Sequence, residues 1–76
     1  MKLKVGDKVR VRTDLEIDIY SSLNNTGEVD FTEEMEHYRG EIVEITYVDE
    51  CGIVEINDCD LCWVDTMFEE VAFNEN

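Results

Sequence analysis

The sequence predicts a mainly β fold: a small, strongly bent antiparallel barrel of about five short strands, with a short helix before the second strand. Three observations lead to this prediction. Apolar residues recur at every second position in several short runs, which is the spacing of half-buried strands. Isolated glycine, asparagine and aspartate residues separate these runs, as they do in turns. Residues 31–38 carry apolar residues at helical spacing.

Residues 3–12 are the first predicted strand, with a turn at Gly6 and Asp7. Apolar and basic side chains alternate along it: Leu3, Val5, Val9 and Val11 against Lys2, Lys4, Lys8, Arg10 and Arg12. The basic side chains would line one outward face, which has two interpretations. One is a small strip that binds an anion or nucleic acid. The other, which we favour, is a solvated face whose charges pair with the chain's own carboxylates.

A long connection is expected over residues 13–30. Residues 14–20 alternate again, so part of this connection should be extended. Residues 21–28 are rich in serine, asparagine and glycine, and we expect them to form a mobile loop. Loops of this length within a compact domain are often functional.

The short helix is predicted over residues 31–38. Its apolar face holds three residues at positions i, i+4 and i+7: Phe31, Met35 and Tyr38. Asp30 is the expected N-cap, and Glu33 three residues later is placed to complete a capping box. Gly40 is expected to end the helix, because glycine adopts positive φ at little steric cost.

The C-terminal half predicts four further strands: residues 41–48, 52–56, 61–64 and 70–73. Turns are expected at residues 49–50 and 57–60. A single 3₁₀ turn is expected at residues 65–68, with Asp65 as its N-cap.

Trp63 and Ile42 are expected in the core. In strand 41–48 the alternation places Ile42 and Glu44 on one face, and Val43 and Ile45 on the other. Most of six aromatic residues are also expected to be buried: Phe31, Tyr38, Tyr47, Trp63, Phe68 and Phe73. Tyr20 should remain partly exposed beside the long loop, as should one of Tyr38 and Trp63.

Three segments together resemble a known family: VGDKVRV at residues 5–11, Met35 followed by YRG at 38–40, and WVDTMFE at 63–69. They look like the small SH3-like barrel proteins of Gram-positive bacteria and their phages, over nearly the whole chain except residues 21–28. The resemblance implies an SH3-like barrel of bacterial or phage origin and no particular activity. Eukaryotic SH3 domains bind proline motifs with an aromatic-rich first loop. Here that loop offers only Tyr20, so such binding is not expected.

The 76 residues predict one domain, residues 1–76, with a frayed tail at 74–76. The net charge of −14 is unevenly distributed. Residues 1–12 hold five basic side chains and one carboxylate, whereas the remainder holds nineteen carboxylates and a single base, Arg39. Such a surface repels nucleic-acid phosphates and favours basic partners.

We expect a cytoplasmic protein. No apolar run approaches the ~20 residues of a membrane-spanning helix, and the first residues lack the apolar core of a signal peptide. Three cysteines, an odd number, are typical of a reducing compartment.

Metal binding is one possible chemistry of the cysteines. Cys59 and Cys62 form a C-x-x-C pair, and with Cys51 and His37 they would make a tetrahedral zinc site. However, Cys62 falls in a predicted strand, and a second C-x-x-C pair is absent. We therefore expect free cysteines that pack as small apolar residues, with no metal and no cofactor.

The spacing of residues identifies no nucleophile–base pair, so we do not expect an enzyme. The first hypothesis is an acidic, non-enzymatic protein-binding module that docks its partner through residues 13–38. Its candidate binding residues are Tyr20, Glu34 and Tyr38. The alternative is a phage-type nucleic-acid mimic that inhibits a host DNA- or RNA-binding enzyme through rows of carboxylates: Asp14, Glu16, Asp18, Glu33, Glu34 and Glu36. We expect a monomer that binds a protein of basic character, and neither nucleic acid nor a membrane.

Overall fold

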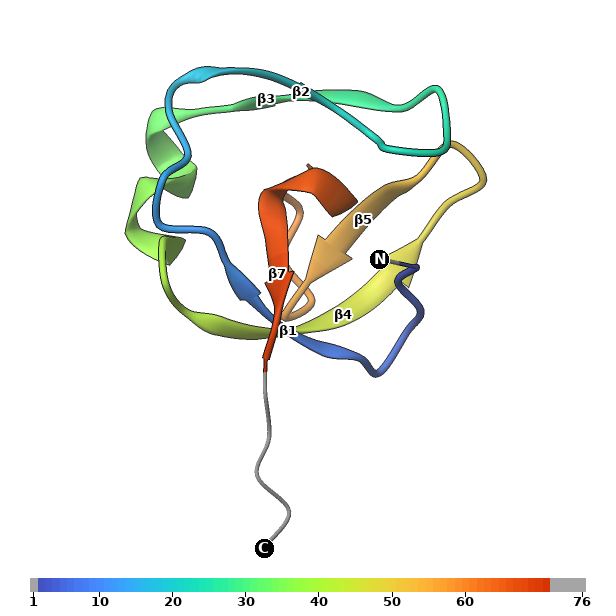
Figure 1. The fold of residues 1–76 in the computed structure, drawn as a ribbon. Coiled ribbons are helices and arrows are strands. Elements are labelled where there is room, and N and C mark those ends of the chain that lie inside the picture. The colour runs from blue at the N-terminus through green and yellow to red at the C-terminus, as the bar shows by residue number, and fades with distance from the viewer. Residues whose placement is uncertain (1, 72–76) are drawn as a thin grey trace, which may run out of the picture.

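A five-stranded antiparallel sheet curls into a half-barrel in the computed structural model, which describes residues 2–71 (Figure 1). The strand order is β6-β5-β4-β1-β7. The bounds are β1 Lys8–Val11, β4 Ile42–Val48, β5 Ile53–Ile56, β6 Trp63–Val64 and β7 Phe68–Glu70. A short 3₁₀ helix, η1 (Glu33–Tyr38), precedes β4, the second strand of this sheet along the chain. The predicted fold class is therefore confirmed.

Strand β1 pairs with two strands, β4 on one side and β7 on the other. Val9 lies opposite Val43 of β4, and Val11 lies opposite Phe68 of β7. These four side chains are buried, because alternate residues of each strand point to the concave face of the sheet. The same register places Lys8 opposite Glu44 and Arg10 opposite Glu69. The basic face of β1 therefore lies among the chain's own carboxylates.

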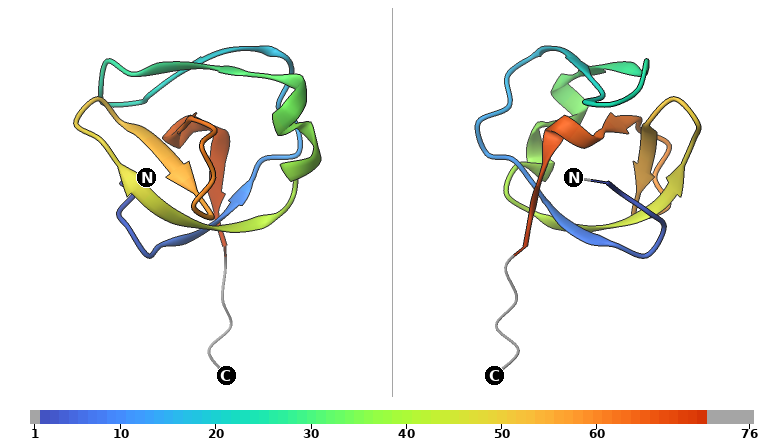
Figure 2. Two further views of the ribbon diagram at one scale, coloured as in Figure 1. Left: turned by 180° about the vertical axis from the view of Figure 1, so that it is seen from behind. Right: turned by 45° about the vertical axis from the view of Figure 1, so that its right-hand side comes forward.

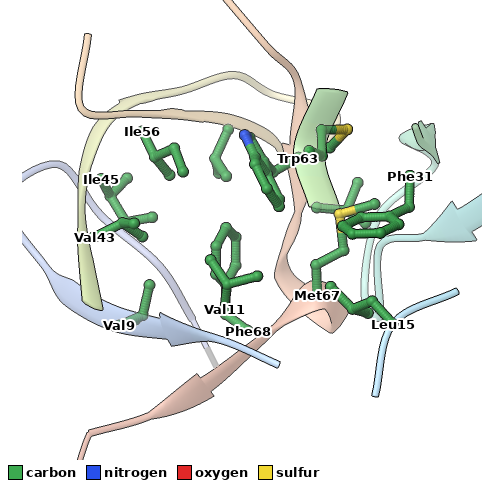
Figure 3. Close-up of a cluster of buried hydrophobic side chains, with 13 residues drawn as sticks. Val9, Val11, Leu15, Phe31, Val43, Ile45, Ile56, Trp63, Met67 and Phe68 are labelled. Carbon is green, nitrogen blue, oxygen red and sulfur yellow. The ribbon is translucent and has the colours of Figure 1, made fainter. Parts of the chain in front are cut away.

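Trp63 lies at the centre of the core and is fully buried, as predicted. Its ring contacts three other aromatic rings, with centroids 6.2 Å from Phe31, 5.5 Å from Tyr38 and 5.7 Å from Phe68. Figure 3 shows Trp63 between the aliphatic side chains of the sheet and Phe31. Within residues 2–71, its indole Nε1 is buried and has no hydrogen-bond partner.

Two predicted core residues lie on the surface instead. Ile42 is 49% exposed and Tyr47 is 50% exposed. The predicted faces of strand 41–48 are correct, because Val43 and Ile45 point inward while Ile42 and Glu44 point outward. Ile42 shares its face with the charged Glu44, and this face points outward, so the prediction that Ile42 lies in the core is wrong. Tyr47 points outward because the register between β4 and β5 shifts at Ile45–Tyr47. Phe73 lies outside the described residues.

The predicted long connection is largely a β-hairpin. Strands β2 (Asp18–Ser21) and β3 (Glu28–Phe31) form a separate two-stranded antiparallel sheet. Figure 2 shows this hairpin arching over the open side of the half-barrel. Tyr20 and Phe31 point toward the core and meet edge to face, with ring centroids 6.5 Å apart. Phe31 therefore ends a strand rather than beginning the helix.

The loop of this hairpin, residues 22–27, is joined to the rest of the fold by hydrogen bonds. The Gly27 amide donates to the Cys51 carbonyl over 2.8 Å, and the Leu23 amide donates to the Asp65 carboxylate over 3.0 Å. Ser22 is buried. These contacts connect the hairpin to the β4–β5 turn and to η2 (Asp65–Met67), the second 3₁₀ turn of the structure.

The two predicted N-caps, Asp30 and Asp65, are both wrong. Thr32 is the N-cap of η1, because Asp30 is still paired with Ile19 within the hairpin. Met35 takes the place in the capping box that we expected Glu33 to take. Its Sδ accepts a hydrogen bond from the amide of the N-cap residue, Thr32, over 3.3 Å. The cap of η2 is Val64 rather than Asp65, whose carboxylate turns to the hairpin loop.

The predicted turns are confirmed where the structure describes them. Gly6 and Gly40 have φ of +98° and +79°, and the turn after β5 places Asn57 and Asp58 at φ of +51° and +56°. The last strand lies earlier than predicted, because β7 begins at Phe68 and ends at Glu70, and Val71 is not part of it. Residues 72–73 of the predicted strand and the tail at 74–76 lie outside the described residues. Among residues 2–71, no helix has the length and apolarity needed to cross a membrane.

Candidate functional site

An open groove lies between η1 and the connection from β5 to β6. Its volume is about 730 Å³. Eight residues line it: Glu33, Glu34, Glu36, His37, Tyr38, Cys59, Asp60 and Leu61. We call it the η1 groove. Four of its residues are carboxylates, and its apolar part consists of Tyr38 and Leu61.

Tyr38 connects the two sides of the η1 groove. Its ring packs edge to face on Trp63, with an angle of 87° between the planes. Its hydroxyl donates a hydrogen bond to Cys59 Sγ over 3.7 Å. The pKa of Tyr38 is raised above its ordinary value, chiefly by this hydrogen bond and to a smaller extent by burial. The ring of His37 lies against Tyr38 at a centroid distance of 4.2 Å.

Arg39 is the base nearest in sequence to the groove, but its side chain is held on the core side of η1. Its Nε donates to the Leu15 carbonyl over 2.9 Å, and its guanidinium lies 5.0 Å from the centroid of Phe31. One nitrogen also lies 3.4 Å from Glu36. Among the described residues, Glu36 is the only groove carboxylate with an ion pair. Glu33, Glu34 and Asp60 are exposed. These three carboxylates are therefore available to cationic groups of a partner.

The structure brings together two of the three predicted binding residues. Glu34 and Tyr38 both line the η1 groove. Tyr20 lies elsewhere, on β2, where its hydroxyl accepts a hydrogen bond from the Glu16 amide over 3.0 Å. Sequence reasoning missed Asp60 and Leu61. Asp60 lies in the predicted turn at 57–60, whereas Leu61 was predicted to begin a strand that in fact begins at Trp63. Nothing in the local sequence shows that this segment packs beside η1.

The alternative zinc site is not assembled. Within residues 2–71, no group of three or more histidine, cysteine, aspartate or glutamate side chains has an arrangement that could hold a metal ion. Cys59 is near η1, whereas Cys51 lies in the β4–β5 turn beside Gly27. All three cysteines are unpaired. The prediction that they pack as small apolar residues is wrong for Cys51 and Cys62, which are exposed.

Comparisons of the chain with family models, with curated proteins and with solved structures found no match. The resemblance to small SH3-like barrel proteins of Gram-positive bacteria and phages is therefore still a prediction.

Proposed function

We propose that the chain is a non-enzymatic protein-binding module that holds a basic segment of a partner protein in the η1 groove. The observation that supports this most directly is the composition of the groove. Glu33, Glu34 and Asp60 are exposed carboxylates, and they surround an apolar surface formed by Tyr38 and Leu61.

This arrangement is suited to lysine and arginine side chains. Carboxylates accept charge-assisted hydrogen bonds from ammonium and guanidinium groups, and these are stronger than neutral hydrogen bonds. The aliphatic stems of the same side chains can lie on apolar surface while their charged ends stay hydrated. In addition, the net charge of −14 would accelerate the approach of a basic partner.

The proposal describes a cytoplasmic monomer without a cofactor. Two observations support it. The like charge of two copies opposes self-association, because each copy carries −14. The three free cysteines suit a reducing compartment, where disulfides are rare.

The second candidate function is a mimic of nucleic acid that inhibits a DNA- or RNA-binding enzyme. The exposed Glu33 and Glu34 of the groove favour it, because a mimic needs free carboxylates. Asp14 does not, because Arg12 holds it in a two-pronged ion pair at 3.0 and 2.9 Å. Binding of a mimic through exposed carboxylates would be strongly screened by salt. Capture of a basic nucleic-acid-binding protein that is unchanged at about 0.5 M salt would contradict the mimic proposal.

Calorimetric titration with a synthetic peptide that alternates lysine and serine tests the main proposal. The groove variant combines Glu34→Gln with Asp60→Asn. The matched control combines Glu50→Gln with Glu70→Gln, which removes the same charge from exposed positions outside the groove. Exposed ion pairs contribute roughly 0.2–1 kcal/mol each, so we expect the groove variant to bind about 3–10-fold more weakly.

The control variant should change the dissociation constant less than about twofold, because it alters only the general field of the molecule. Equal weakening in both variants would mean that the peptide is attracted by the whole acidic surface. The η1 groove would then have no special role, and the proposed site would be wrong.

A further inference from the structure

A second surface adjoins the η1 groove on the outer side of the β2–β3 hairpin. Ile17, directly before β2, is 59% exposed, and Ile19 within β2 is 61% exposed. Both isoleucines lie along a shallow hollow that also includes Asp18, Asp30, Phe31, Thr32 and Glu33. We call this hollow, with its two isoleucines, the hairpin patch. Burial of the isoleucines would remove a substantial apolar area from water.

The chain leaves these isoleucines outside because the opposite face of the hairpin already covers the core. Tyr20 and Phe31 occupy that inner face. Ile17 and Ile19 are two positions apart in the chain, with one residue between them, which places them on the same outward face. Phe31 is fully buried, so it supports the hollow from below.

The backbone edge of β2 is a poor site for adding a strand from another chain. The Ile19 amide donates to the carboxylate of Asp18 over 2.8 Å. The Ser21 carbonyl accepts a hydrogen bond from the Thr66 hydroxyl over 2.8 Å. An incoming strand would need backbone groups of this kind. Docking on the hairpin patch would therefore occur through side chains.

Charge indicates what would occupy the patch. Its polar rim consists of the carboxylates of Asp18, Asp30 and Glu33. A second copy of this chain would bring like charges to that rim. A partner with apolar side chains flanked by lysine or arginine would complement both the isoleucines and the rim.

The hairpin patch and the η1 groove share one residue, Glu33, which lines both. We infer that a partner segment spans the two surfaces, placing basic side chains in the groove and apolar side chains on Ile17 and Ile19. This inference rests on the proposed function and adds that the partner segment is amphipathic.

Two synthetic peptides of equal length and charge test the inference. One alternates lysine with leucine, and the other alternates lysine with serine. The patch variant combines Ile17→Ser with Ile19→Ser. Val5→Ser is the control, because Val5 is similarly exposed at 63% and lines neither surface. Calorimetry should give the leucine peptide about tenfold tighter binding to the unaltered protein, equivalent to about 1.4 kcal/mol.

The patch variant should lose this tenfold preference and still bind the serine peptide normally, whereas Val5→Ser should keep the preference. Equal affinity of the unaltered protein for both peptides would overturn the inference and leave the proposed function standing. A preference that survives in the patch variant would also overturn it, because the leucines would then bind elsewhere. Failure of the serine peptide to bind at all would instead refute the proposed function.

Discussion

At the scale of single residues, Trp63 joins the half-barrel to the elements that cover it. Its ring contacts Phe31 of the hairpin, Tyr38 of η1 and Phe68 of β7. Tyr20 extends this set by packing on Phe31. The sequence predicted the burial of Trp63. It did not predict these neighbours, because they come from segments far apart in the chain.

Replacement of Trp63 by alanine should lower the free energy of unfolding by about 3–5 kcal/mol, because it opens a large cavity in the core. Trp63→Phe should cost less, since the indole Nε1 has no hydrogen-bond partner to lose within residues 2–71. Denaturant unfolding of both variants measures the difference. Equal losses in the two variants would contradict this account, because they would show that a phenyl ring in the cavity recovers none of the lost packing.

The raised pKa of Tyr38 predicts that the protein loses stability at alkaline pH. Its pKa is raised in the folded protein above the ordinary value of 10.0, chiefly by the hydrogen bond to Cys59. The folded state therefore holds this proton more tightly than the unfolded state. The resulting stabilisation is complete below pH 10.0 and is lost as the pH rises through the folded pKa.

Denaturant unfolding at about pH 9 and about pH 11 tests this contribution. The loss of stability between the two should be smaller in Tyr38→Phe than in the unaltered protein. Tyr47→Phe is the control, because Tyr47 is exposed on β4. An identical loss in Tyr38→Phe and the unaltered protein would show that the hydroxyl of Tyr38 makes no such contribution.

At the scale of elements, alternation predicted most strands of the half-barrel and the inward face of β1. For β4 it separated the two faces correctly, but the prediction that Ile42 lies in the core chose the outward face. The β2–β3 hairpin was missed for a physical reason. Strand β3, Glu28–Phe31, has two carboxylates in four residues, and Phe31 also fitted a helical spacing with Met35. Pairing with β2 and burial of Phe31 outweighed that local pattern. The groove depends on the same kind of contact, because residues 59–61 are brought to η1 by packing.

Gly27 provides a test of how the hairpin is attached. A Cβ at this position would lie 2.5 Å from the Cys51 carbonyl oxygen and 2.9 Å from a side-chain carbon of Ile53. Gly27→Ala should therefore displace the hairpin loop or the β4–β5 turn and cost about 1–3 kcal/mol. Thr26→Ala, at the exposed neighbouring position, should change stability by less than ~0.5 kcal/mol. Equal thermal melts for both variants would contradict the close approach.

At the scale of the whole molecule, carboxylates far outnumber the bases that could neutralise them. The net charge is −14, and residues 2–71 contain two ion pairs, Arg12–Asp14 and Arg39–Glu36. Like charges at this density repel one another and destabilise a compact state. The composition alone predicted this repulsion. The structure adds that the bases of β1 face carboxylates across the strand ladder.

Added salt should therefore stabilise the protein near neutral pH. We expect the melting temperature to rise by a few degrees between about 20 mM and about 300 mM salt. In a domain of this size, about 1 kcal/mol corresponds to roughly 4–8 °C. A melting temperature that falls with salt would show that local ion pairs outweigh the repulsion. The carboxylates would then be better compensated than their number implies.

We propose the η1 groove as a defined binding site rather than one part of a uniformly acidic surface. Backbone amide chemical shifts, recorded by NMR during titration with the lysine–serine peptide, test this most directly. We expect the largest shifts at Glu33–Tyr38 and at residues 59–61, with little change at Glu50 and Glu70. Shifts of similar size at Glu50, Glu70 and the groove would contradict it, because they would show that the peptide follows charge alone.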